Sequence, residues 1–138
     1  MSCRDVEPGF VREHLGDSKY QIVDVRTPAE YERYHLAGSM LMPIQVLHDL
    51  LDMLDKTRPV IFLCEHANRS RVVCRNFGHM FKETYNMQGG MELWLKLGFE
   101  FESGLDKGGM LWLEVLRGKG YPVDKLGLDY STRPRMTG

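Results

Sequence analysis

The stretch that decides the fold is Val60-Ile61-Phe62-Leu63 followed by Cys64-Glu65-His66-Ala67-Asn68-Arg69-Ser70. Four consecutive apolar residues without polar alternation are typical of a strand that is covered on both faces. After the polar loop, apolar residues recur at helical spacing as far as Phe81. A buried strand, a short loop and a helix together predict one unit of a parallel α/β sheet.

The same alternation continues on both sides of this unit. We predict strands at residues 4–6, 20–25, 39–42, 60–63 and 84–87. We predict helices at residues 8–15, 28–34, 45–54 and 70–81 and after Gly90. The helix at 28–34 has the clearest start, because Thr27, Pro28 and Glu30 form a capping-box pattern. The expected fold is α/β, with a mainly parallel central sheet and helices on both of its faces.

Length and composition fit one globular domain. The chain has 138 residues, of which 43% are hydrophobic and 27% are charged. A chain of this size buries enough surface to fold without disulfides or a structural metal. We assign residues 1–104 to the α/β domain and residues 105–138 to a C-terminal extension. We expect this extension to be partly helical and either packed on the domain or partly disordered beyond Asp129.

Charge and hydropathy argue against two classes of partner. The balance of 18 Lys and Arg against 19 Asp and Glu lacks the basic footprint of a nucleic-acid binder. No apolar run approaches the roughly 20 residues of a membrane-spanning helix, and the early charges of Arg4 and Asp5 argue against a secretory signal. The three cysteines, Cys3, Cys64 and Cys74, are few and odd in number, which indicates free thiols and a cytoplasmic location.

The loop after the buried strand carries the candidate chemistry. Ligands of open parallel sheets bind outside the carboxyl ends of the strands. A short loop there can turn its backbone N–H groups inward as an anion cradle, and the next helix adds its positive end. We expect the Cys64 sulfur at the centre of this cradle, where the dipoles favour a nucleophilic thiolate. Asp24 and Glu65 would oppose the thiolate if they lie close, whereas Arg69 and a protonated His66 would support it.

Most free cysteines are buried packing residues rather than reactive ones. Cys74 fits that ordinary interpretation, because it lies in the middle of a predicted helix beside Val73 and Phe77. Cys64 differs from it in lying at a strand end, before a polar and cationic loop.

Four segments, taken in order, resemble the rhodanese family of sulfurtransferases. They are IVDVRTPAEY at 22–31, YHLAGS at 34–39, the loop at 64–70, and Gly89-Gly90 with Trp94. Together these segments cover about residues 4–104. The resemblance implies the rhodanese-like fold and a persulfide mechanism without a cofactor. Cys64 would take a sulfur from thiosulfate or a similar small-molecule donor and pass it to a thiophilic acceptor, such as a thiol or a sulfur-carrier protein.

The resemblance also implies roles for the residues around Cys64. The loop expected to hold the anion consists of Glu65, His66, Ala67, Asn68, Arg69 and Ser70, supported by Asp24 and Arg26. Arg69 would either contact the donor or brace the loop through Asp24, and His66 would either contact substrate or be a bystander. We expect His35 to be structural, fixing its turn by a hydrogen bond.

One departure from the family pattern concerns the loop backbone. The family usually has glycine where this chain has Ala67. If the position requires a positive φ angle, alanine costs on the order of 1 kcal/mol. The alanine therefore bears on the catalytic efficiency of the loop more than on its assignment as the active-site loop.

Three alternative functions compete with sulfur transfer. Phosphatases and arsenate reductases of related fold use a loop one residue longer, whereas only four residues separate Cys64 from Arg69 here. A non-catalytic rhodanese-like binding or regulatory module is the second alternative. A zinc site of Cys64, His66, Cys74 and His79 is the third, and geometry disfavours it, since helical residues five apart point about 140° away from each other. We therefore expect no metal. The oligomeric state and the physiological donor and acceptor stay open.

Overall fold

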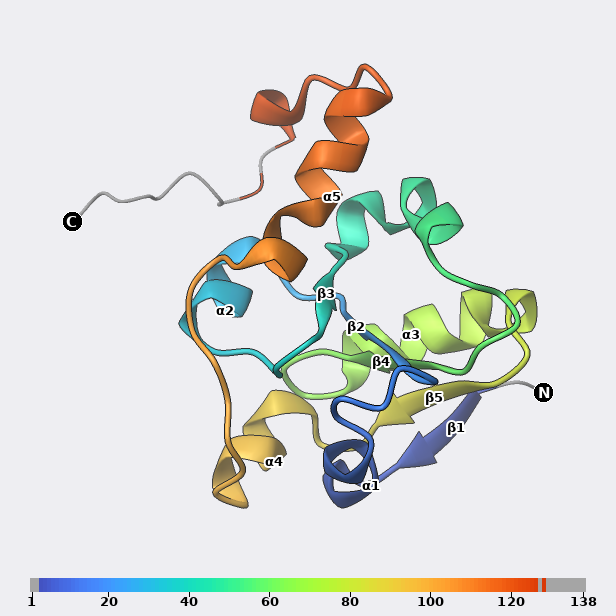
Figure 1. The fold of residues 1–138 in the computed structure, drawn as a ribbon, viewed down its shortest axis with the longest axis vertical. Coiled ribbons are helices and arrows are strands. Elements are labelled where there is room, and N and C mark those ends of the chain that lie inside the picture. Colours follow the sequence, from blue (N-terminus) through green and yellow to red (C-terminus); the bar gives the residue numbers. More distant parts are fainter. Residues whose placement is uncertain (1–2, 127, 129–138) are drawn as a thin grey trace.

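A five-stranded parallel sheet forms the centre of the molecule, with strand order β1-β5-β4-β2-β3 (Figure 1). The computed structural model describes residues 3–126 and 128. The strands are β1 (Cys3–Val6), β2 (Gln21–Asp24), β3 (Met40–Leu41), β4 (Val60–Leu63) and β5 (Thr84–Met87). The α-helices are α1 (Pro8–Glu13), α2 (Pro28–Arg33), α3 (Asn68–Phe77), α4 (Gly90–Lys96) and α5 (Lys107–Gly118). The 3₁₀ helices are η1 (Ile44–Asp49), η2 (Leu51–Met53), η3 (Gly78–Met80) and η4 (Val123–Lys125).

Helices cover both faces of the sheet, as the sequence predicted. Alternate side chains of β2 and β4 point to opposite faces, so that Ile22 and Ile61 belong to one core cluster and Val23 and Phe62 to the other. The first cluster includes apolar residues of α1 and α4, which lie together below the sheet in Figure 1. The second includes residues of α3, η1, η2 and α5. The predicted α/β class is therefore confirmed.

The segment at 45–54 is helical, as predicted, but its helices are of the 3₁₀ type rather than α. It forms the 3₁₀ helices η1 and η2. Leu50 lies between them, and its backbone φ angle is −110°. The predicted apolar face of the segment is buried. The leucines Leu47 and Leu50, like Leu51 and Leu54, lie three residues apart, and this spacing fits the repeat of a 3₁₀ helix as well as that of an α-helix.

The residues that follow position 104 include α5, which packs against β3 and α2. Asp106 caps this helix by accepting a hydrogen bond from the Gly109 amide at 2.9 Å. Trp112, Leu113 and Leu116 are buried in the same core cluster as Leu41 of β3, and α5 lies over the β3 edge of the sheet in Figure 1. The segment beyond Asp129, expected to be partly disordered, lies outside the described residues.

The cysteines differ from expectation. Cys3 of β1 and Cys74 of α3 form a disulfide with a Cα–Cα distance of 5.6 Å, and Cys64 is free and buried. The prediction of three free thiols was therefore wrong for two of them. The fold brings the pair together because β1 joins the sheet beside β5, on which α3 packs. Within the described part of the chain, no helix has both the length and the apolar character needed to cross a membrane.

Candidate active site

The candidate site lies where β2 and β4 end side by side. The strands are in parallel register with Asp24 opposite Leu63, and the Val25 amide donates to the Leu63 carbonyl at 3.0 Å. Cys64 follows directly, so its loop begins at the carboxyl edge of the sheet. This is the edge at which ligands of parallel sheets bind.

Three donor groups surround the Cys64 sulfur. The Ala67 amide lies 3.1 Å from Sγ, the Ser70 amide 3.3 Å and the Ser70 hydroxyl 3.4 Å. The loop therefore turns N–H groups inward around the sulfur, the geometry that the sequence analysis expected of an anion cradle. Cys64 is 1% exposed, so few water molecules compete with these donors.

Ala67 has the left-handed backbone conformation that the family's usual glycine would allow. Its φ angle is 81°, and it is the only residue other than glycine with a positive φ in the described part of the chain. The conformation directs the Ala67 amide at the sulfur and lets its carbonyl accept from the Arg71 amide at 3.0 Å. Helix α3 consequently begins at Asn68, two residues earlier than predicted.

The start of α4 holds the base of the loop. The Met91 amide donates to the Cys64 carbonyl at 2.9 Å, and the Glu92 amide donates to the Glu65 carbonyl at 3.0 Å. Gly90 precedes these donors with a φ of +60°, and a Cβ atom there would collide with the carbonyl oxygens of Cys64 and Glu65. Only glycine allows α4 to approach the loop this closely.

Asp24, Arg26 and Glu65 form a largely buried charge network beneath the loop. The fully buried Arg26 donates to Asp24 Oδ2 at 2.8 Å and to Glu65 Oε1 at 3.0 Å. The Tyr34 hydroxyl donates to Glu65 Oε2 at 2.8 Å, and burial together with this hydrogen bond raises the pKa of Tyr34. Because Arg26 neutralises much of their charge, the two carboxylates oppose a thiolate less than the sequence alone suggested. Sequence reasoning missed Tyr34 as a member of this network.

Arg69 braces the loop, but not through Asp24. Its guanidinium forms two 2.8 Å hydrogen bonds to the Glu30 carboxylate of α2, whereas Asp24 is occupied by Arg26. Burial raises the pKa of Glu30, but hydrogen bonds from Arg69 and from the Thr27 amide outweigh it and lower that pKa to about 2. The capping box predicted at Thr27 and Glu30 is present. One carboxylate thus both caps α2 and holds Arg69.

Ser70 connects the cradle to two further polar groups. Its hydroxyl donates to Asn86 Oδ1 at 2.5 Å, and Asn86 Nδ2 donates to Asp5 Oδ1 at 3.0 Å. Ser70 and Asn86 are both fully buried. Neither Asn86 nor Asp5 was predicted as a site residue from the sequence. The available signal was the period of two in β5, which places Asn86 on the sheet face that also carries Phe62 of β4.

The remaining predicted residues lie at the edge of the site or outside it. His66 is exposed and lies 3.0 Å from the Glu92 carboxylate, and Asn68 is the exposed first residue of α3. His35 is fully buried and bonds through Nδ1 to the Tyr31 carbonyl at 2.8 Å, which agrees with its expected structural role. The rejected zinc set loses Cys74, whose sulfur is bonded to Cys3.

The family of the chain follows from its sequence match. A family model described as a rhodanese-like domain matches residues 7–97. The chain belongs to the rhodanese-like domain family. The resemblance drawn from the four segments is thereby confirmed.

Named relatives and solved structures agree with this assignment. A thiosulfate sulfurtransferase GlpE from Ectopseudomonas mendocina is 35% identical over 74 residues, which are 53% of this chain and 68% of the relative. A protein of the same name from Pseudomonas aeruginosa is 30% identical over 90 residues, covering 64% of this chain and 81% of the relative. The crystal structure of a rhodanese-like domain protein from Staphylococcus aureus has a TM-score of 0.64 at 27% identity and covers 72% of this chain and 97% of that chain.

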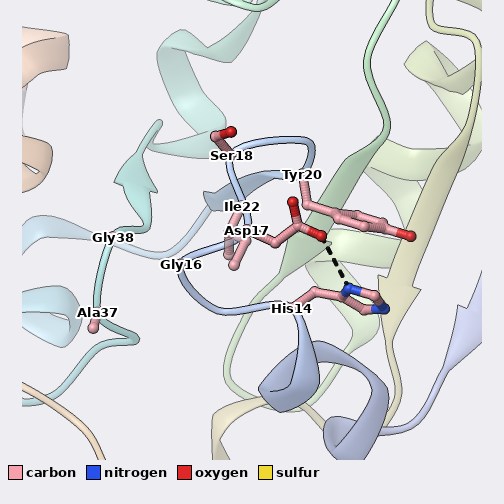
Figure 2. Close-up of a pocket in the computed structure, with 8 residues that line it drawn as sticks. All are labelled: His14, Gly16, Asp17, Ser18, Tyr20, Ile22, Ala37 and Gly38. Atoms are coloured by element: carbon pink, nitrogen blue, oxygen red, sulfur yellow. Dashed lines mark hydrogen bonds and ion pairs between the residues drawn. The ribbon is translucent and has the colours of Figure 1, made fainter.

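A separate pocket of this rhodanese-like domain lies at the opposite edge of the sheet, before β2 and β3. Figure 2 shows the residues that line it, which are His14, Gly16, Asp17, Ser18, Tyr20, Ile22, Ala37 and Gly38. The dashed line in Figure 2 joins His14 Nδ1 to Asp17 Oδ2, which lie 3.4 Å apart. None of the residues predicted for the active site lines this pocket, so the pocket is separate from the candidate active site.

Proposed function

We propose that this protein is a sulfurtransferase that moves a sulfane sulfur from thiosulfate, or a similar donor, to a thiophilic acceptor through a Cys64 persulfide. The observation that carries the proposal is the set of three donors around the Cys64 sulfur, at 3.1, 3.3 and 3.4 Å. The two backbone amides are fixed donors that stabilise negative charge on sulfur without reorganisation, and the Ser70 hydroxyl adds a third hydrogen bond to a thiolate when it turns from Asn86. They would serve the thiolate and the persulfide anion alike.

The reaction takes place in two displacements. In the first, the Cys64 thiolate attacks the outer sulfur of thiosulfate, a new S–S bond forms, and the original S–S bond breaks to release sulfite with its electron pair. In the second, a thiolate or cyanide attacks the outer sulfur of the persulfide. The Cys64 thiolate leaves, and the acceptor becomes a persulfide or thiocyanate. The negative charge stays within the cradle throughout.

Arg69 acts as a positioning residue in this proposal. Its two hydrogen bonds to Glu30 fix the segment between Ala67 and Ser70, which supplies all three donors. The guanidinium is 35% exposed, so it also adds a positive charge near the route by which a dianionic donor approaches. We assign His66 no direct role, because Glu92 holds its ring at the surface.

Intact-protein mass spectrometry under non-reducing conditions tests the proposal. The full chain is treated with thiosulfate, and we expect a gain of one sulfur atom that cyanide reverses. The disulfide leaves Cys64 as the only free thiol among the three cysteines, so the gain identifies its carrier. The Cys64→Ser variant should show no gain.

Other outcomes favour the alternative functions. If neither thiosulfate nor other persulfide donors load the wild-type protein, it is a non-catalytic rhodanese-like module. Hydrolysis of an aryl phosphate that is abolished by Cys64→Ser would instead indicate oxyanion chemistry. The predicted cytoplasmic location rested on free thiols and stays a prediction, and the division of the chain at residue 104 is likewise a proposal.

A further inference from the structure

Three side chains outside the candidate active site converge where the C-terminal extension meets the domain. His35 follows α2, Glu102 lies between α4 and α5, and Asp106 caps α5. One ligand atom from each lies within 4.8 Å of the others. The backbones of His35 and Glu102 also pair directly, with two N–H···O bonds of 2.8 Å. The fold therefore holds an imidazole and two carboxylates together across residues far apart in sequence.

The ring of His35 has only one consistent arrangement of its protons when neutral. Nδ1 lies 2.8 Å from the Tyr31 carbonyl oxygen, which can only accept, so Nδ1 carries a proton. Nε2 then presents its lone pair, and it lies 3.0 Å from Asp106 Oδ2, which also only accepts. Within the described residues no donor faces Nε2, although His35 is fully buried. Nε2 and Asp106 Oδ2 are therefore two ligand atoms that face each other and that a cation could share.

The surroundings hold these groups as metal ligands are usually held. The His35 ring is stacked on the Tyr31 ring, with centroids 3.8 Å apart and planes 6° apart. Asp106 Oδ1 accepts from the Tyr31 hydroxyl at 2.8 Å and from the Gly109 amide at 2.9 Å, which directs Oδ2 at His35. A metal-bound histidine commonly donates its other N–H to a backbone carbonyl, and bound carboxylates commonly accept further hydrogen bonds.

We propose that His35 Nε2, Glu102 and Asp106 bind one Zn²⁺ ion. One imidazole and two carboxylates suit zinc, and three protein ligands leave its fourth position for water. Mg²⁺ fits less well, because it favours oxygen ligands only. Glu102 is exposed, which gives the ion a route from solvent. The bound ion would link α5 to the domain and is independent of sulfur transfer at Cys64.

Calorimetric titration of the chelator-treated full chain with zinc chloride tests the proposal. We expect one ion per chain, with affinity reduced at least about tenfold in Glu102→Gln and in Asp106→Asn. Asparagine retains the cap of α5, and Glu102 is exposed, so both variants should fold. Glu114→Gln, which alters an exposed carboxylate elsewhere on α5, is the matched control and should bind like wild type. Cys64→Ser should also bind like wild type.

Thermal melting gives a second readout, because an ion that binds only the folded chain stabilises it. At one zinc concentration, the melting temperature should rise less in Glu102→Gln than in wild type and in Glu114→Gln. The proposal is overturned by the absence of saturable binding. It is equally overturned if Glu102→Gln and Glu114→Gln bind alike, or if Cys64→Ser abolishes binding and so places the ion on the thiol.

Discussion

The hydroxyl of Ser70 lies 2.5 Å from the side-chain oxygen of Asn86, and this contact commits the single hydroxyl proton away from the Cys64 sulfur. The same hydroxyl is 3.4 Å from Sγ. While the hydroxyl donates its proton to Asn86, its oxygen can accept a hydrogen bond from a Cys64 thiol. If the hydroxyl rotates away from Asn86, it can instead donate to a Cys64 thiolate. The two backbone amides of the cradle have no such choice and always donate.

Removal of the Ser70 hydroxyl should slow sulfur loading without abolishing it. Ser70→Ala keeps both amide donors to Sγ, so we expect the loading rate with thiosulfate to fall about 2- to 10-fold, the equivalent of one hydrogen bond. Time-resolved intact mass spectrometry measures this rate. Ser103→Ala, which removes a hydroxyl bonded to the Arg33 carbonyl, should load like wild type. A loss as complete as that of Cys64→Ser would show that the amides are insufficient.

The strain at Ala67 predicts an unusual response to glycine. Ala→Gly in a helix normally costs about 1 kcal/mol, but at Ala67, with its φ of 81°, relief of left-handed strain offsets this cost. We expect Ala67→Gly to be about 1 kcal/mol less destabilising than Ala29→Gly in α2, measured by urea denaturation. Equal losses in the two variants would mean that the loop does not strain alanine.

The Glu30–Arg69 pair predicts a pH-dependent contribution to stability. The pKa of Glu30 is lowered from 4.5 to about 2 in the folded protein, so the pair stabilises the fold above the unfolded value. This stability is lost as pH falls towards 2. Glu30→Gln should therefore be less stable than wild type at pH 7, by about 1 kcal/mol or less for a partly exposed pair. The difference should shrink in denaturation curves recorded at pH 3.5, and a difference independent of pH would contradict the assignment.

Gly90 should tolerate no side chain. Gly90→Ala places a Cβ against the carbonyl oxygens of Cys64 and Glu65 at a φ of +60°, and we expect a loss of about 2–5 kcal/mol from strain and overpacking. Gly118→Ala is the matched control, since a Cβ there meets nothing within 4 Å. It should be neutral or stabilising in chemical denaturation. Equal stability of the two variants would show that α4 can move away from the loop.

Much of the fold was predictable because local signals and tertiary structure agree. The buried run before Cys64 forms the central strand β4, and the Thr27 capping box starts α2 where expected. The type of helix at 45–54 was not predictable, because spacings of three residues suit both helix types. The predicted order of strand, loop and helix around Cys64 was also confirmed, whereas the site placed on that loop stays a prediction.

The partners of individual side chains were less predictable. Arg69 pairs with Glu30 rather than with Asp24. The Asp24 carboxylate is already bonded to Arg26, which lies two residues away in sequence. The Cys3–Cys74 bond spans 71 residues, and no local pattern reports a distance of that kind. The convergence of His35 with Asp106 likewise appears only once α5 is packed on the domain.

The disulfide has a consequence for assembly. β1 is an edge strand that pairs only with β5 in the described sheet, and edge strands of this kind are the elements most readily exchanged between copies of a protein. While Cys3 is bonded to Cys74, β1 cannot leave its sheet without α3. The oxidised chain is thereby protected from strand-swapped dimers, and only reduction would open that route.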